Sequence, residues 1–95
     1  MSDALKHAGY TVSRRWGMTK AVADRTLVND RCISYALAIS LGLGALFDED
    51  AKAERAWMEA EREEFDNNTA MWIIYRDGEE GLRRVLEAVN YERNI

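Results

Sequence analysis

The segment "CISYALAISLGLGALF", Cys32–Phe47, is the longest stretch of the chain without a charged residue. It is shorter than the roughly 20 apolar residues that a membrane-spanning helix needs. A helix that is apolar nearly all round is buried inside a globular protein. We therefore expect residues 33–41 to form the central and least exposed helix of the fold.

The residues at its ends predict the limits of this central helix. Asn29 or Asp30 is expected to cap its N-terminus, because short polar side chains accept hydrogen bonds from the first free backbone amides. Gly42 and Gly44 are expected to end or kink it near Leu41, since each glycine costs up to about 1 kcal/mol inside a helix. Small side chains line up on it as a narrow groove that a neighbour could approach closely: Ser34, Ala38, Gly42 and Ala45.

The whole chain favours helices, and the predicted fold class is all-α, a compact bundle of four or five helices. Its 95 residues contain no proline, and 47% are hydrophobic and 32% charged, which is the composition of one globular domain. Within this single domain, residues 1–95, we expect a basic N-terminal segment, core helices, an acidic helix and C-terminal helices. These parts span residues 1–17, 19–47, 48–66 and 69–95.

Capping residues predict the helices that flank the central one. A first short helix is expected from Ser2 to Gly9, followed by an irregular or extended segment over residues 10–17. Thr19 is expected to cap the next helix, whose residues Val22, Ala23 and Thr26 share one face.

The C-terminal third contains one ambiguous segment and one clear helix. Residues 69–76 hold good strand formers, but a single strand would have no sheet to join, so we interpret them as a helix capped by Thr69. Asp77 and Glu80 match the capping box of a final helix. Its apolar residues repeat with helical spacing: Leu82, Val85, Leu86 and Val89.

Residues 49–65 are expected to form an acidic helix capped by Asp48, with two apolar stripes. The first consists of Phe47, Ala51, Met58 and Phe65, and the second of Ala53, Ala56 and Ala60 with Trp57 beside it. One stripe would pack on the central helix and leave the second free for a partner. Because a core of this size is marginal, we predict a homodimer formed through the second stripe.

The same helix carries most of the negative charge, since residues 32–66 hold nine acidic and three basic side chains. Negative charge steers a partner with a basic surface, and a tryptophan is a frequent anchor in protein interfaces. The predicted protein-binding residues are Glu54, Trp57, Glu61 and Glu64. An ordinary solvated helix face is the alternative interpretation.

The segment "TKAVADRTLVNDRCISYAL", residues 19–37, resembles the helix-turn-helix DNA-binding motif of bacterial repressors of the Lac repressor type. The resemblance implies that the second helix would read bases in the major groove and that nearby basic residues would contact phosphates. The residues it assigns to bases are Asn29, Arg31, Ser34 and Tyr35, and those it assigns to phosphates are Arg14, Arg15 and Lys20. Two ordinary packed helices would give the same pattern.

The segment "DGEEGLRRVLEAVNYERNI", residues 77–95, resembles the final helix of the toxin-binding domain of Xre-type antitoxins. This resemblance implies a protein-binding C-terminal half. The leading functional hypothesis is therefore a small regulator or inhibitor that binds a protein, like antitoxins and phage anti-defence proteins. The alternative is a transcriptional regulator that binds DNA through residues 19–37.

Enzymatic activity is not expected, and neither is a metal or another cofactor. The single cysteine, Cys32, and the single histidine, His7, cannot supply a Cys/His metal cluster or a convincing Ser/His/Asp arrangement. No membrane association is expected. The first 20 residues lack the apolar core of a signal peptide, so we expect a cytoplasmic protein of a bacterial cell or a virus-infected host cell.

Overall fold

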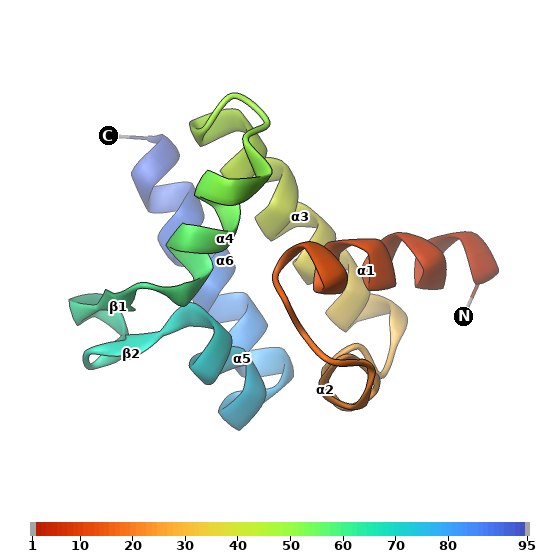
Figure 1. The fold of residues 1–95 in the computed structure, drawn as a ribbon. Coiled ribbons are helices and arrows are strands. Elements are labelled where there is room, and N and C mark those ends of the chain that lie inside the picture. Colours follow the sequence, from red (N-terminus) through yellow and green to blue (C-terminus); the bar gives the residue numbers. More distant parts are fainter. Residues whose placement is uncertain (1, 95) are drawn as a thin grey trace.

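The computed structural model describes residues 2–94 and confirms the predicted all-α class (Figure 1). Within these residues there are six α-helices, one more than the upper predicted number, and a short two-stranded hairpin. The elements are α1 (Asp3–Arg15), α2 (Lys20–Thr26), α3 (Asp30–Leu46), α4 (Ala51–Glu59), β1 (Glu61–Arg62), the 3-10 turn η1 (Glu63–Phe65), β2 (Asn68–Thr69), α5 (Ala70–Asp77) and α6 (Glu79–Arg93). No single helix among the described residues is both long and apolar enough to cross a membrane.

Helix α3 is the central helix, as predicted, and α1 and α6 pack on it (Figure 1). Asn29 caps its N-terminus by accepting a hydrogen bond from the Cys32 amide at 2.9 Å. The predicted end near Leu41 is wrong, because α3 continues through Gly42 and Gly44 to Leu46. Gly42 is needed for packing instead of termination: a Cβ there would lie 2.6 Å from Cγ1 of Val89 on α6.

One side of α3 remains open to solvent. Ile33 and Ile39 are fully buried, as expected for the least exposed helix. Leu41 is 72% exposed, so its predicted burial is wrong. The reason is that α1 and α6 pack on other sides of α3, and Leu41 lies at the edge of an open hollow between α1 and α3.

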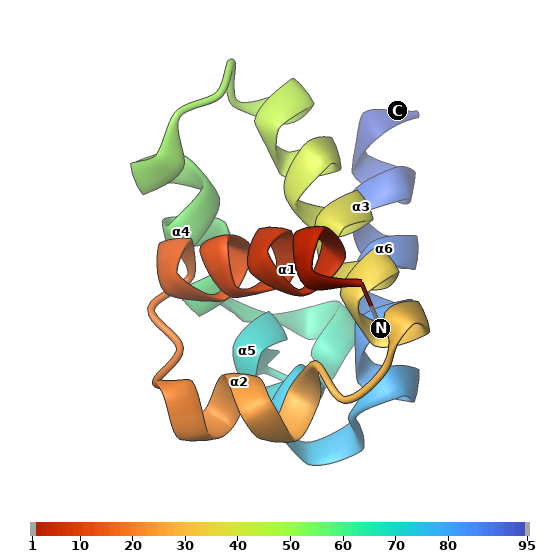
Figure 2. The same ribbon diagram turned by 90° about the vertical axis from the view of Figure 1, so that its right-hand side faces the viewer.

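Helix α1 is longer than predicted and crosses α3. Its predicted end at Gly9 is wrong, because the segment expected to be irregular continues the helix to Arg15. Gly9 is buried against Ile33 of α3 at the crossing, and the following turns bury Val12 and bring Trp16 into the core at 1% exposure. Figure 2 shows α1 and α2 running one above the other across the same face of the molecule.

The predicted helix over residues 49–65 begins later and ends earlier than expected. Asp48 and Glu49 adopt left-handed backbone conformations, with φ angles of 52° and 62°. Asp50, and not Asp48, caps α4 by accepting hydrogen bonds from the amides of Lys52 and Ala53. The loop turns the chain by 116° between α3 and α4.

After α4 the chain forms a hairpin in place of two further helical turns. Strands β1 and β2 are antiparallel, with Glu61 opposite Thr69. Asp66 and Asn67 take left-handed conformations, which short polar side chains tolerate better than most, and they reverse the chain between the strands. The turn buries Phe65 at 2% exposure.

The helical interpretation of residues 69–76 is confirmed. Thr69 caps α5 by accepting a hydrogen bond from the Trp72 amide at 3.0 Å. Helix α6 is also confirmed, but the capping box is not formed, because Gly78 occupies the cap position with φ of 61°. Asp77 instead pairs with Arg76.

Candidate protein-binding surface

Trp57, the predicted anchor for a partner, lies inside the protein. Its side chain is 6% exposed, and its Nε1 donates to the carboxylate of Glu92 on α6 at 3.2 Å. The guanidinium of Arg62 covers the ring at 4.4 Å from its centroid. The prediction of an exposed aromatic on α4 is wrong, because this face of α4 packs toward α6 and β1.

Glu54 is also buried, at 3% exposure, and joins three helices. Its Oε2 accepts hydrogen bonds from Nε1 of Trp16, the residue that ends α1, at 2.6 Å and from Ser40 Oγ of α3 at 2.7 Å. Arg15 donates to Ser40 at 2.7 Å and lies 3.7 Å from Glu54 Oε1. Glu54 therefore holds the fold together and is not available to a partner.

The other two predicted protein-binding residues are exposed but do not lie on α4. Glu61 is on β1, and Glu64 is on η1, where it pairs with Arg62 at 3.3 Å. In the second apolar stripe, Ala53 is half-buried and only Ala56 and Ala60 are exposed. The acidic surface therefore lies on the loops that flank α4, and it lacks the tryptophan assigned to it.

A different surface of the protein presents exposed aromatic side chains. Trp72 and Tyr75 of α5 are 45% and 37% exposed, and their rings are stacked with centroids 5.8 Å apart. The guanidinium of Arg25, from α2, lies 4.6 Å from the Tyr75 ring centroid and donates to the Tyr75 hydroxyl at 3.2 Å. We call these three residues the aromatic-arginine patch.

The patch is held rigidly by the core beneath it. Between its two aromatic residues, Ile73 and Ile74 of α5 are fully buried. Residues three apart in a helix lie on the same face, so burial of the two isoleucines directs Trp72 and Tyr75 outward together. Helix α2 packs on α5 and thereby brings Arg25 to the patch. The aromatic pair was detectable in the sequence as an i, i+3 pair, but nothing in the sequence indicated the contact with Arg25.

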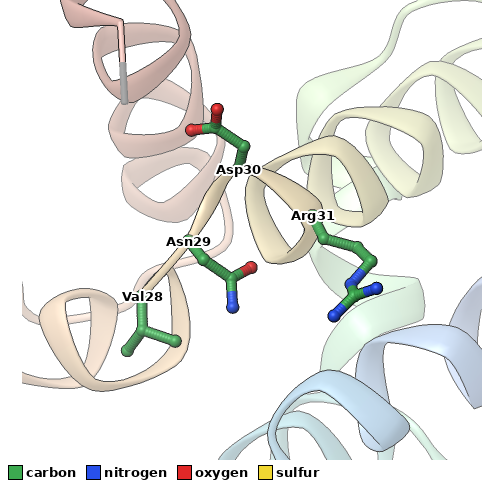
Figure 3. A pocket seen from close by; sticks show the side chains of 4 residues that line it. All are labelled: Val28, Asn29, Asp30 and Arg31. Atoms are coloured by element: carbon green, nitrogen blue, oxygen red, sulfur yellow. The ribbon is translucent and has the colours of Figure 1, made fainter.

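The helix-turn-helix-like segment consists of α2, a turn over residues 27–29, and α3. Val28, Asn29, Asp30 and Arg31 line an open hollow of about 570 Å³ at this turn (Figure 3). The side-chain Oδ1 of Asn29 already accepts the capping hydrogen bond from the Cys32 amide, and Arg31 Nε lies 3.2 Å from Glu79 on α6. Helix α2 packs mainly on α5, whereas the motif requires it to pack on α3.

The predicted DNA-binding residues fall into two separate groups. The group assigned to phosphates lies where α1 ends and α2 begins, and the group assigned to bases lies beyond the other end of α2 (Figure 2). Arg15 is engaged with Ser40, and Lys20 pairs with Asp24 at 2.9 Å, whereas Arg14 is exposed. At the start of α3, Ser34 is exposed and Tyr35 is half-buried against the core.

Asp24 is the ionisable group that connects α1 and α2. The Tyr10 hydroxyl and the Lys20 ammonium donate to its carboxylate, and both lower the pKa of Asp24 below its ordinary value of 3.8. The same hydrogen bond raises the pKa of Tyr10. A carboxylate with a lowered pKa in the folded state stabilises that state above its unfolded pKa, and this contribution is lost as the pH falls through the folded value.

We therefore expect Asp24→Asn to reduce the loss of stability on acidification below about pH 4. The check is urea unfolding of wild type and variant at a series of pH values, together with an NMR titration of the Asp24 carboxyl carbon. Asp3→Asn, in the first turn of α1, is the control. Identical pH profiles for wild type and Asp24→Asn would contradict the expectation.

The described residues show no grouping suited to a metal ion. No three His, Cys, Asp or Glu side chains within residues 2–94 lie close enough together to hold one. Cys32 is buried, and burial raises the pKa of its thiol. Its side chain packs in the core as a small apolar group.

Comparison with protein-family models, with curated proteins and with solved structures gave no match to this chain.

Proposed function

We propose that the chain is a small non-enzymatic regulator or inhibitor that acts by binding another protein through the aromatic-arginine patch. The observation that carries this proposal is the exposed stack of Trp72 and Tyr75 with Arg25 against it. Tryptophan, tyrosine and arginine are the residue types that contribute most to binding energy in protein interfaces. The patch takes the place of the predicted Trp57 anchor.

The arrangement of the patch favours binding for two physical reasons. Two helices with buried faces fix the three side chains, so little side-chain entropy is lost when a partner docks. Each side chain also combines an apolar surface with a hydrogen-bonding group, which suits an interface from which water is partly excluded. A partner would present an apolar pocket for Trp72 and an acceptor for Arg25.

The hairpin gives the proposed interface an acidic rim. Glu61 of β1 lies opposite Thr69, the residue that caps α5, so this exposed acid lies near the N-terminal end of the helix that carries the aromatics, and the exposed Glu64 follows it on η1. Such charges accelerate association with a partner that has a basic surface. This partner chemistry fits an inhibitor of the antitoxin-like or phage anti-defence-like kind, a class also supported by the resemblance of residues 77–95.

The test is capture of proteins from a nuclease-treated extract of the organism that encodes the chain. We compare wild type with the double variant Trp72→Ser/Tyr75→Ser, and use Tyr91→Ser as the matched control, because Tyr91 is 71% exposed on α6. Wild type and control should retain the same partner, and the double variant should bind it at least about a hundredfold more weakly. Equal retention by the double variant would overturn the proposed surface.

DNA binding through residues 19–37 is the second candidate. What favours it is that α2 and α3 are joined by a short turn, with Arg31 and Ser34 exposed at the start of α3. Omitting the nuclease from the same capture separates the two candidates. A DNA-binding protein would retain duplex fragments at low salt and release them steeply as the salt concentration rises.

A further inference from the structure

The open side of α3 carries a regular row of mostly exposed residues. We call it the α3 seam: Arg31, Ser34, Ala38, Leu41 and Ala45, continued by Asp48 just after the helix. Ala38 is half-buried, the other seam residues are exposed, and Leu41 at 72% is the most exposed large hydrophobic residue of the described chain. A leucine this exposed in the middle of the row is the feature that needs explanation.

The spacing of the seam is that of a helix-pairing surface. Within α3, successive members are separated alternately by three and four residues, which is the spacing that keeps one face of a helix against a second helix. Asp48 follows the end of the helix. Beside it, α1 and α3 enclose an open hollow of about 430 Å³ lined in part by Ala8, Leu37 and Leu41. The seam therefore offers apolar contact area and room for a side chain from another molecule.

The seam is complementary to itself when two copies are placed antiparallel. With a twofold axis between Ala38 and Leu41, Ala38 of each copy faces Leu41 of the other. Ser34 then faces Ala45, and Arg31 faces Asp48. Leu41 meets the small Ala38, and Arg31 at one end of each seam meets Asp48 at the other end of its partner.

We propose that the α3 seam is the interface of a homodimer with antiparallel α3 helices. Twofold pairing requires that one surface complement itself, and the order of size and charge along this seam meets that requirement. The acidic loop of residues 48–50 would lie at the N-terminal end of the other copy's α3, where the helix dipole favours negative charge. Arg31, which contacts Glu79 in its own chain, would be shared between Glu79 and Asp48.

Leu41 provides the first test, because a side chain exposed in the monomer can be changed without disturbing the core. The dimer dissociation constant of Leu41→Ser, measured by sedimentation velocity over a wide concentration range, should rise roughly a hundredfold or more, since each dimer loses two buried leucines. Tyr91→Ser, an equally exposed residue on α6, should dimerise like wild type. A wild-type chain that stays monomeric at high micromolar concentration would overturn the proposal.

Charge exchange tests the pairing of Arg31 with Asp48. Arg31→Glu and Asp48→Arg should each weaken the dimer about tenfold, because like charges then face each other across the interface. The double variant Arg31→Glu/Asp48→Arg should recover most of the loss, with circular dichroism confirming that every variant is folded. Failure of the double variant to recover would exclude this antiparallel register.

Disulfide trapping tests the register independently. Mixing Ala38→Cys chains with Leu41→Cys chains should give mainly the mixed cross-link under mild oxidation, while Cys32 stays buried and unreactive. A parallel dimer would instead favour the cross-link between two Leu41→Cys chains. This surface is separate from the aromatic-arginine patch, so the failure of either proposal leaves the other standing.

Discussion

Replacing Glu54 with alanine is expected to lower the free energy of unfolding by about 3 kcal/mol, a large part of the 5–15 kcal/mol that stabilises a typical domain. The variant leaves the Trp16 indole NH and the Ser40 hydroxyl buried without their acceptor, and it leaves Arg15 without its nearby carboxylate. An unsatisfied buried donor costs more than a hydrogen bond gains. Urea unfolding followed by circular dichroism measures the change.

Two further variants distinguish the loss of the Glu54 hydrogen-bond network with Trp16, Ser40 and Arg15 from a general effect of removing a glutamate. Glu54→Gln keeps the shape and one acceptor oxygen, so it should lose clearly less stability than Glu54→Ala. Glu61→Ala removes an exposed glutamate and should change stability by no more than about 0.5 kcal/mol. If Glu54→Ala unfolds at the same urea concentration as Glu61→Ala, the network does not stabilise the fold.

Replacing Gly81 with alanine is the second change with a large expected effect. We expect it to destabilise the protein, although alanine is the better helix former. Alanine is favoured over glycine inside a helix by about 1 kcal/mol, so α6 alone would gain stability. In the folded protein, however, the new Cβ would lie 2.3 Å from the carbonyl oxygen of Ile73. Because this is a backbone atom, α5 and α6 must separate, and we expect a net loss of about 2 to 3 kcal/mol.

Gly44→Ala is the matched control, since Gly44 is also buried in a helix. There the nearest atoms to a new Cβ belong to the exposed carboxylate of Glu49, at 2.8 Å, and this side chain can rotate away. Stability should stay constant or rise by up to about 1 kcal/mol. Thermal unfolding of both variants gives the comparison, and a stabilised Gly81→Ala would show that the helices have room to adjust.

The features that the sequence predicted correctly are mostly local. Thr19, Asn29 and Thr69 cap helices because each cap depends only on a side chain and an amide three residues later. The central helix was predictable because an uncharged run of its length must be buried. The glycines of the same segment led to a wrong prediction of the helix end. Gly42 is required because α6 packs closely against it, and not because the helix ends there.

The candidate site could not be predicted because it depends on contacts between distant residues. Trp57 lies on an acidic segment and resembles a surface anchor, yet it is buried by Arg62 and bonded to Glu92. Trp72 follows a cap and precedes two isoleucines, as a core residue would, yet the isoleucines occupy the core and leave it exposed. The sequence shows which residues share a face of a helix. It does not show which of these faces packs against the core.

The position of α3 between α1 and α6 also has a consequence for synthesis on the ribosome. The main packing partner of α3 is α6, and residues 47–78 separate the two helices in the chain. Until α6 has left the ribosome, the apolar side of α3 that packs on it has no cover. The nascent chain therefore exposes this side of α3 while residues 47–93 are made, and the core around α3 is completed only when α6 emerges.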